Sequence, residues 1–274
     1  MSNQLFSIFL MSASLFCASV SFAHETKYQE VQISENLFYT DIQCIYPSQL
    51  RYSSKNVQEK VDYTIRLHDA NWNEDTKSWD LKYDGGKSPL SPEDAVPVVR
   101  GPFGLVLTDG HHHLLASLQL NAQTIPVKVI ADLSQLDETS FWAEMEQNGW
   151  AYPYNILGER SPPPKDVKLL QDDPNRYFAA IIARKCRADG DLNSSRGATY
   201  PVWVKVGKDI PFIEFRISDA LWKKGLRYNY DMGDNPSEAL VEESRQILLD
   251  AKIPGLRVVP ERTHYLDVKL GEQR

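Results

Sequence analysis

The stretch that decides the fold is Thr108-Asp109-Gly110-His111-His112-His113-Leu114-Leu115-Ala116. Just before it, residues 96–100 and 105–108 are strand-like and flank the turn sequence Gly101-Pro102-Phe103-Gly104. Two apolar runs separated by glycine and proline predict a pair of short strands with a tight connection. The stretch therefore leads from the second of these strands into the next element.

That next element is predicted to be a helix. Asp109 or Gly110 can cap its first turn, and the apolar positions Leu114, Leu115 and Leu118 share one face. Half of the chain's six histidines stand at its beginning. A strand, a glycine and a helix start in this order can present backbone N–H groups to an anion such as phosphate.

The remaining chain mixes helices with strands and hairpins. A strand is expected at 41–46, and Pro126 places the strand 125–130 at a sheet edge, because proline cannot donate to a central ladder. Apolar spacing and capping signals predict further helices at 55–67, 140–148, 174–183 and 238–251. This order of elements is typical of an α+β (mixed α/β) fold.

Two segments indicate the domain organisation. Residues 1–23 contain no Lys, Arg, Asp or Glu and end in Ser21-Phe22-Ala23, which predicts a secretory signal peptide, with an uncleaved anchor as the alternative. An extended, proline-rich link around residues 152–166 then divides the chain. We expect a first unit over 24–155 and a C-terminal α+β extension over 156–274 that packs on it.

We expect the protein to be exported and to be either periplasmic or secreted. After cleavage of the signal peptide we expect no membrane contact. Cys44 and Cys186 would then be in an oxidising compartment. Two alternatives remain there: a disulfide between them, or two buried thiols. The formal charge of −7 excludes a general nucleic-acid-coating protein, because such proteins neutralise phosphates with Lys and Arg. A local basic site remains compatible with this charge.

Several short elements follow one another in an order that resembles a known family. Pro47-Ser48-Gln49, then Val57 and Lys60, then Asp109-Gly110-His111-His112 occur at matching spacings. Further similar elements are Phe141-Trp142, residues 169–176 and residues 211–215. Over roughly residues 40–225 the chain thus resembles the ParB-like nuclease family of the ParB/sulfiredoxin superfamily. The resemblance implies a small mixed sheet with helices, whose glycine–histidine turn faces a nucleotide or phosphate.

The resemblance and the residue types together suggest roles at this turn. His112 is expected to act as acid or base, because an imidazole can move a proton near neutral pH, with His111 and Lys60 beside it. Phosphate or nucleotide contacts are expected from Gln49, Lys60, Asp109, Gly110, His111 and His113. Mg²⁺ would neutralise charge in such a reaction. Zinc is disfavoured, because consecutive helical residues point about 100° apart.

Two departures from the family pattern separate the candidate functions. Asn56 stands where the family usually has Glu, and His113 stands where an Arg often follows the paired histidines. One hypothesis is hydrolysis of a phosphoester in a nucleotide or nucleic acid. The alternative is a non-catalytic, secreted protein of the same fold that binds a nucleotide or a protein partner.

Purely structural explanations also exist for several polar and aromatic residues. Lys60 next to Glu59 is compatible with a solvated helix face. Asp172 and Asp173 resemble a metal-binding pair, but Asp173 before Pro174 is better explained as a helix cap. Structural ion pairs are expected for Arg100, Arg176 and Glu214, and packing for Trp142, Trp150, Tyr152 and Tyr154.

Overall fold

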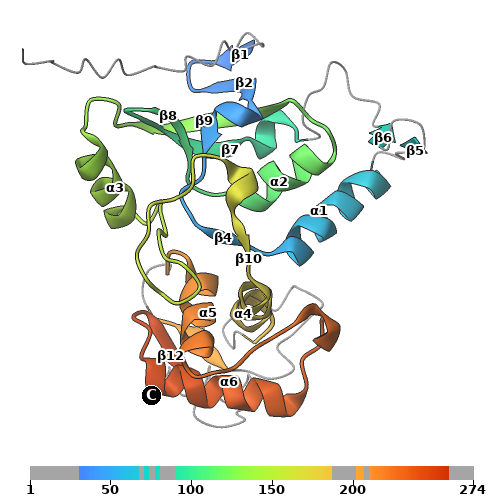
Figure 1. Ribbon diagram of the computed structural model, residues 1–274, viewed down its shortest axis with the longest axis vertical. Coiled ribbons are helices and arrows are strands. Elements are labelled where there is room, and N and C mark those ends of the chain that lie inside the picture. Colours follow the sequence, from blue (N-terminus) through green and yellow to red (C-terminus); the bar gives the residue numbers. More distant parts are fainter. Residues whose placement is uncertain are drawn as a thin grey trace, which may run out of the picture.

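The computed structural model describes residues 31–67, 71–73, 78–80, 90–186, 202–206 and 210–258. Figure 1 shows a sheet with helices α1, α2 and α3 in its upper half and helices α4, α5 and α6 in its lower half. We call these parts the sheet lobe and the helical lobe. The predicted signal peptide at 1–23 lies outside the described residues.

The sheet lobe is built on a mixed sheet, in which six strands are ordered β1-β2-β9-β7-β8-β3 among the described residues. Their bounds are β1 Val31–Ser34, β2 Leu37–Asp41, β3 Ile45–Tyr46, β7 Val96–Gly101, β8 Gly104–Leu107 and β9 Thr124–Asp132. The β7–β9 and β3–β8 pairs are parallel, and the other pairs are antiparallel. The predicted α+β class and the predicted β7–β8 pair are confirmed.

Helices cover both faces of this sheet. Successive residues of a strand point to opposite faces, so Val98 packs with Leu114 of α2 (His111–Gln119), whereas Val99 packs with Phe141 of α3 (Glu138–Gln147). Helix α1 (Ser54–Leu67) in turn packs on α2 through Val57 and Val61. Helix α2 is therefore held between the sheet and α1, with its first turn at the rim.

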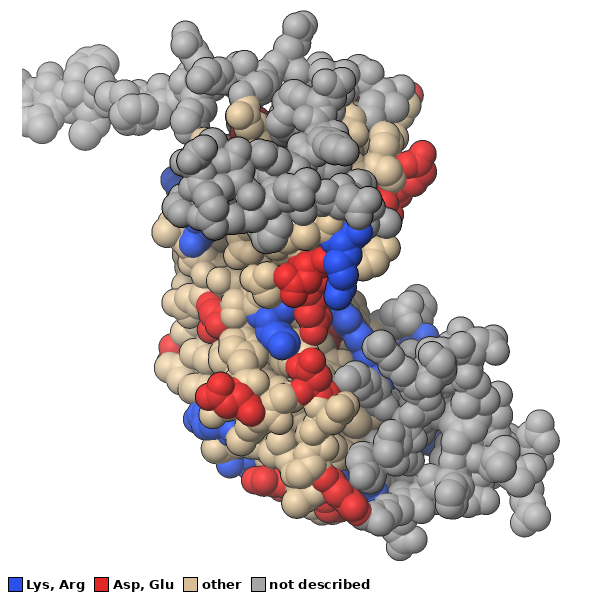
Figure 2. All heavy atoms as spheres, turned by 90° about the vertical axis from the view of Figure 1, so that its right-hand side faces the viewer, with Lys and Arg blue, Asp and Glu red and all other residues tan. Residues whose placement is uncertain are grey.

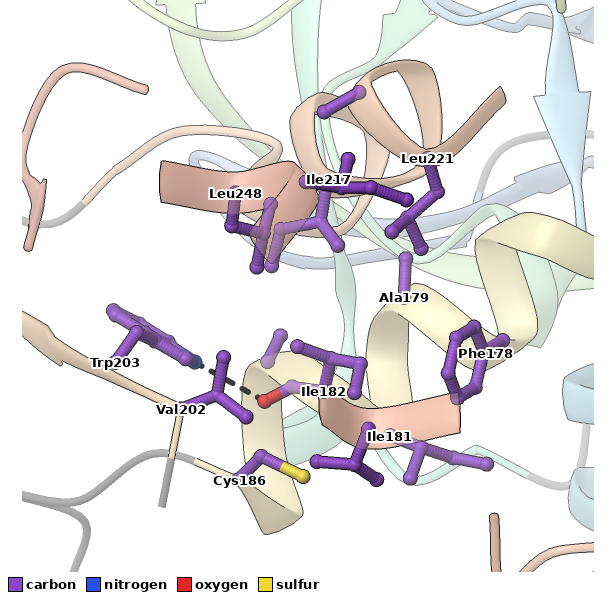
Figure 3. Close-up of a cluster of buried hydrophobic side chains, with 14 of the residues drawn as sticks. Phe178, Ala179, Ile181, Ile182, Cys186, Val202, Trp203, Ile217, Leu221 and Leu248 are labelled. Atoms are coloured by element: carbon purple, nitrogen blue, oxygen red, sulfur yellow. Dashed lines mark hydrogen bonds between the residues drawn. The ribbon is translucent and has the colours of Figure 1, made fainter. Parts of the chain in front are cut away.

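The helical lobe has its own apolar core. Its elements are α4 Pro174–Lys185, α5 Ile213–Lys223, α6 Glu238–Ala251, β11 Trp203–Lys205 and the antiparallel β12 Leu256–Val258. In Figure 3, Phe178 and Ile182 of α4 lie with Ile217, Leu221 and Leu248 in this core. The indole N–H of Trp203 donates to the carbonyl of Ile182 over 3.1 Å, which fixes β11 against α4.

The two lobes are joined by a short parallel pair and by a buried charge network. Strand β4 (Arg51–Tyr52) pairs with β10 (Gln171–Asp172). The Arg51 guanidinium, which is fully buried, donates to Asp173 Oδ2 over 2.8 Å and to Asp219 Oδ1 over 2.6 Å. Tyr152 completes this Arg51 network by donating to Asp219 Oδ2 over 2.7 Å. No local pattern in the chain predicts these contacts.

Helix ends follow the local capping signals. Asp173 accepts from the Arg176 amide and precedes Pro174 at the first position of α4, which confirms the predicted cap. Ser237 caps α6 through the Leu240 amide. The remaining elements are short: β5 Asn71–Asn73, β6 Ser78–Asp80, and 3₁₀ turns at Ile42–Cys44, Pro92–Asp94, Val167–Leu169 and Tyr230–Met232. None of the described helices has the length and apolarity to cross a bilayer.

Two strand predictions need correction. The continuous strand expected at 41–46 is wrong, because Asp41 ends β2 and accepts from the Gln43 amide to cap a 3₁₀ turn, so that strand resumes only at β3. The edge position expected for β9 is also wrong, since β9 lies between β2 and β7. Pro126 is tolerated because pairing with β7 begins one residue later, at Val127, so that proline has β2 as its one paired neighbour.

The disulfide left open between Cys44 and Cys186 is not formed, and both residues are thiols in the structure. Cys44 ends a 3₁₀ turn beside the sheet. Cys186 follows α4 and packs in the core of the helical lobe, where Figure 3 shows its sulfur among apolar side chains. The two cysteines thus belong to different lobes.

Candidate functional site

The start of α2 depends on the backbone conformation of Gly110. This residue caps α2 with φ 88° and ψ 15°, in the left-handed region that residues with a Cβ rarely adopt. A Cβ placed here would lie 2.8 Å from Cγ1 of Val96. The preceding Asp109 accepts the Gly110 amide on Oδ1 over 2.6 Å. A glycine is therefore required for the chain to turn from β8 into α2.

The turn leaves backbone donors at the beginning of α2. The Leu114 amide donates to the Gly110 carbonyl over 2.9 Å, and this is the first bond of the helix. The amides of His111, His112 and His113 precede it, as the first N–H groups of any helix do, and the helix dipole adds partial positive charge there. This arrangement confirms the predicted helix start and suits an anion.

His111 holds the loop between β3 and β4. Its Nε2 accepts from the Ser48 amide over 3.1 Å, and only 2% of the residue is exposed. Burial, with a smaller effect of Arg176, lowers the pKa of His111 to about 3. The ring is therefore neutral with its proton on Nδ1, and it positions backbone rather than touching solvent.

His112 makes a similar bond to the next loop segment. Its Nε2 accepts from the Ser53 amide over 3.1 Å. Burial, followed by the charge of Arg176, lowers the pKa of His112 well below its ordinary value. In this geometry the neutral ring offers a donor, Nδ1–H, and proton transfer through Nε2 first requires the Ser53 bond to break.

Lys60 and His113 are brought together across α1 and α2. Lys60 Nζ lies 2.7 Å from His113 Nε2, so that the ammonium donates to the ring. Burial, and next the charge of Arg184, lowers the pKa of Lys60. Burial and then Lys60 lower the pKa of His113. The structure thus places the lysine predicted to contact phosphate beside the first turn of α2.

Gln49 occupies a different environment. It is 4% exposed, and its side-chain amide donates to the Arg51 carbonyl over 2.6 Å. Its backbone forms an isolated parallel bridge with Tyr152. Gln49 therefore supports the junction between the lobes, and the structure gives its predicted ligand contact no geometric support.

Arg176 reaches the site from α4 in the helical lobe. Its Nη1 donates to Asn56 Oδ1 over 3.1 Å, and its charge lowers the pKa of both His111 and His112 at the start of α2. Asn56, which stands where the family usually has Glu, thus contacts an arginine from a segment 120 residues away. No sequence pattern indicated this contact.

The structural ion pair expected for Arg176 is not formed at bonding distance, although the charge of Glu214 acts on it. No carboxylate of the described residues lies within 4.0 Å of its guanidinium. The other two expectations are confirmed, since Arg100 pairs with Asp132 at 3.8 Å, and Glu214 pairs with Arg184 at 3.3 Å. The aromatic residues pack as expected, with Trp142 against Phe103 and Phe141 and with Tyr152 against Tyr154.

The two neighbouring aspartates serve different elements. Asp172 accepts from the amide and the hydroxyl of Ser54 at the start of α1, whereas Asp173 caps α4 and binds Arg51. Within the described part of the chain, no three His, Cys, Asp or Glu side chains are grouped to hold a metal ion. Mg²⁺ prefers oxygen ligands, and the cations and imidazoles around α2 do not fit a magnesium ion held by protein alone.

A comparison with family models identifies the fold family. The family described as "Putative ParB-like nuclease" matches residues 38–195, more than half of the chain. The chain belongs to this ParB-like nuclease family. The matched span of this ParB-like protein contains Asn56, Lys60, the three histidines and Arg176. Membership confirms the resemblance drawn from the ordered short elements.

Solved structures show the same fold. A crystal structure of a protein from Agrobacterium tumefaciens matches with a TM-score of 0.52 and 22% identity, covering 80% of the ParB-like chain and 96% of its own. At this identity the likeness concerns the fold alone. A search of curated proteins gave no match.

Proposed function

We propose that this ParB-like protein binds a phosphate-bearing ligand at the start of α2, with Lys60 as the charged contact. The observation that carries the proposal is the Gly110 turn, which presents the first amides of α2 beside the Lys60 ammonium. Helix N-termini bind phosphate through such amides, and lysine adds a point charge. A nucleotide or a nucleic-acid end is the ligand class we expect.

The histidines contribute mainly by positioning the other groups. His111 and His112 accept amide protons from Ser48 and Ser53, so they fix the loop that leads into α1. His113 accepts from Lys60 and orients its ammonium. The Nδ1–H of His112 is a further donor toward an anionic oxygen. This division of roles favours ligand binding over proton transfer by His112.

Binding of an anion would change the charge state of the site. The pKa of Lys60 is lowered by burial and by Arg184, so the site holds cationic groups close together. A phosphate would offset their repulsion and raise the pKa of Lys60. This coupling predicts that phosphate binding shifts the titration of Lys60 to higher pH.

Hydrolysis of a phosphoester is the second candidate, because the family is described as nuclease-like. In this version the Lys60–His113 pair, 2.7 Å apart and with both pKa values lowered, is the pair placed to move a proton. Export to the periplasm or the medium and binding of a protein partner are further proposals, which rest on residues 1–23 and on the sequence alone.

The test is a combined thermal-shift and product-release experiment on the purified protein. The probes are inorganic phosphate, nucleotides and short nucleic acids, with and without Mg²⁺. Lys60→Met should lose the stabilisation that phosphate gives, and Lys128→Met, which removes an exposed lysine of β9, should keep it. Product formation that disappears in Lys60→Met selects the hydrolase. Absence of stabilisation by every phosphate probe contradicts the proposal.

A further inference from the structure

Two buried arginines share one aromatic ring but differ in how their charges are compensated. The Cζ atoms of Arg51 and Arg176 lie 5.2 and 5.1 Å from the centre of the Phe215 ring. Arg51 binds two carboxylates, those of Asp173 and Asp219. Arg176 has no carboxylate of the described residues within salt-bridge distance. Arg51 therefore has directly bonded carboxylates, whereas the charge of Glu214 acts on Arg176 without a bond of that length.

The donors of Arg176 are also incompletely used. Its Nη1 donates to the neutral amide of Asn56, and its Nε, like that of Arg51, is buried with no acceptor in the described structure. Nearby carboxylates are bound to other groups, because Asp173 holds Arg51 and Glu214 pairs with Arg184. Burying a cation without a directly bonded anion costs stability. A buried arginine of this kind is expected where a ligand supplies the anion that bonds to it.

Arg176 lies against the site through its bond to Asn56, which stands one turn before Lys60 on α1. Its charge acts on His111, His112 and Lys60, and the carboxylate of Asp109 acts on Arg176 in turn. Cations from α1 and α4 thus converge on the positive end of α2. An anion held there would contact three helices, and it would connect the sheet lobe to the helical lobe.

We infer that Arg176 is a second anion-binding group of this site and that the bound group is a terminal, dianionic phosphate rather than an internal phosphodiester. This inference rests on the proposed function. A terminal phosphoryl group carries up to two charges and three outward oxygens, which can meet donors from three sides. An internal diester has one charge, two such oxygens, and an ester chain on each side.

Burial and surface charge favour the terminal group. Arg176 is 7% exposed and His111 is 2% exposed, so a chain that continues in both directions has little room beside them. Figure 2 shows the side of the molecule that lies on the right in Figure 1, and its Lys and Arg side chains lie among Asp and Glu side chains.

The experiment compares a monoester and a diester of one alcohol, phenyl phosphate and methyl phenyl phosphate, by calorimetric titration, with inorganic phosphate as a third probe. The wild-type protein should bind phenyl phosphate about tenfold or more tightly than the diester. Arg176→Gln should weaken phenyl phosphate by about tenfold or more, because a charged contact is lost. The control Arg66→Gln removes an exposed arginine of α1 and should leave affinity unchanged.

A stability measurement separates a ligand contact from a structural role. Arg176→Gln should keep or raise the melting temperature of the unliganded protein, because it removes a buried charge to which no carboxylate of the described residues is bonded. Arg176→Lys, which keeps the charge but loses the planar fork, should also bind phenyl phosphate more weakly. A lowered melting temperature with unchanged phosphate affinity overturns the inference.

The outcomes also distinguish this inference from the proposed function. Equal affinity for monoester and diester, or unchanged phosphate binding in both Arg176 variants, overturns the inference while phosphate binding at Lys60 stands. If the wild-type protein binds none of the three probes, the proposed function fails and the inference fails with it.

Discussion

Replacing Arg51 by Met should destabilise the protein more than any exposed substitution of equal size. The change removes two buried ion pairs, 2.8 Å to Asp173 and 2.6 Å to Asp219. Asp173 keeps its bond from Ser218, and Asp219 keeps its bond from Tyr152, but neither carboxylate retains a cation in direct contact. Breaking one side of a buried ion pair costs about 3–5 kcal/mol, which we expect for the free energy of unfolding here.

This loss should depend on pH. Burial raises the pKa of Asp219 in the folded protein, and Arg51 partly opposes that effect. Without Arg51 the folded pKa rises further above its ordinary value of 3.8, so the folded state binds a proton that the unfolded state releases. The stability of the variant then falls as pH rises from about 4 through the folded pKa. The cost of Arg51→Met should therefore be larger at pH 7 than at pH 5.

Urea unfolding at both pH values measures these free energies, with Arg66→Met as the control on the exposed part of α1. The control should change the free energy of unfolding by less than about 0.5 kcal/mol. The reasoning is refuted if Arg51→Met costs no more than the control, or if its cost is the same at pH 5 and pH 7.

Three further predictions concern the turn, the histidines and the thiols. Gly110→Ala should lower the free energy of unfolding by about 2–4 kcal/mol, because φ is 88° and the new Cβ meets Val96; urea unfolding that shows no loss contradicts this. The His111 ring should not titrate between pH 5 and 8 by NMR, since its pKa is about 3 in the folded state against 6.5 unfolded. Its contribution to stability is present above pH 6.5 and is lost as pH falls toward 3, so an ordinary titration near 6.5 disproves the buried acceptor role. Without reductant, both Cys44 and Cys186 should react with a thiol reagent, and Cys186, which is buried, should react only after unfolding. A disulfide between them would leave both residues unreactive.

Local signals in the sequence were sufficient for most helices and for the strand pair at the site. The Gly101–Gly104 turn, the Asp173-Pro174 cap and the glycine after α3 each act within a few residues, and each lies where it was expected. The helix start at Gly110 was predictable for the same reason, because strand, glycine and helix are consecutive in the chain. The order of strands in the sheet was not, since it depends on pairing between distant segments.

The site shows the same division between local and distant effects. Lys60 and the histidine turn were predicted from short motifs, and the structure brings them together. The bonds that determine chemical roles come from other parts of the chain: Ser53 uses the His112 ring nitrogen, and Arg176 reaches Asn56 from 120 residues away. Neither contact corresponds to a residue spacing that can be recognised in the sequence. The protonation of the histidines and the charge of the site therefore follow only from the three-dimensional structure.

We propose above that an anion binds at the first turn of α2 beside Lys60. The most direct measurement is a crystal structure of the protein grown with tungstate, a phosphate mimic whose electron density is unambiguous. Tungstate should lie within hydrogen-bonding distance of the amides that follow Gly110 and of Lys60 Nζ, and its density should be lost in Lys60→Met. Tungstate bound only elsewhere, or an empty turn at a concentration that fills other sites, would contradict it.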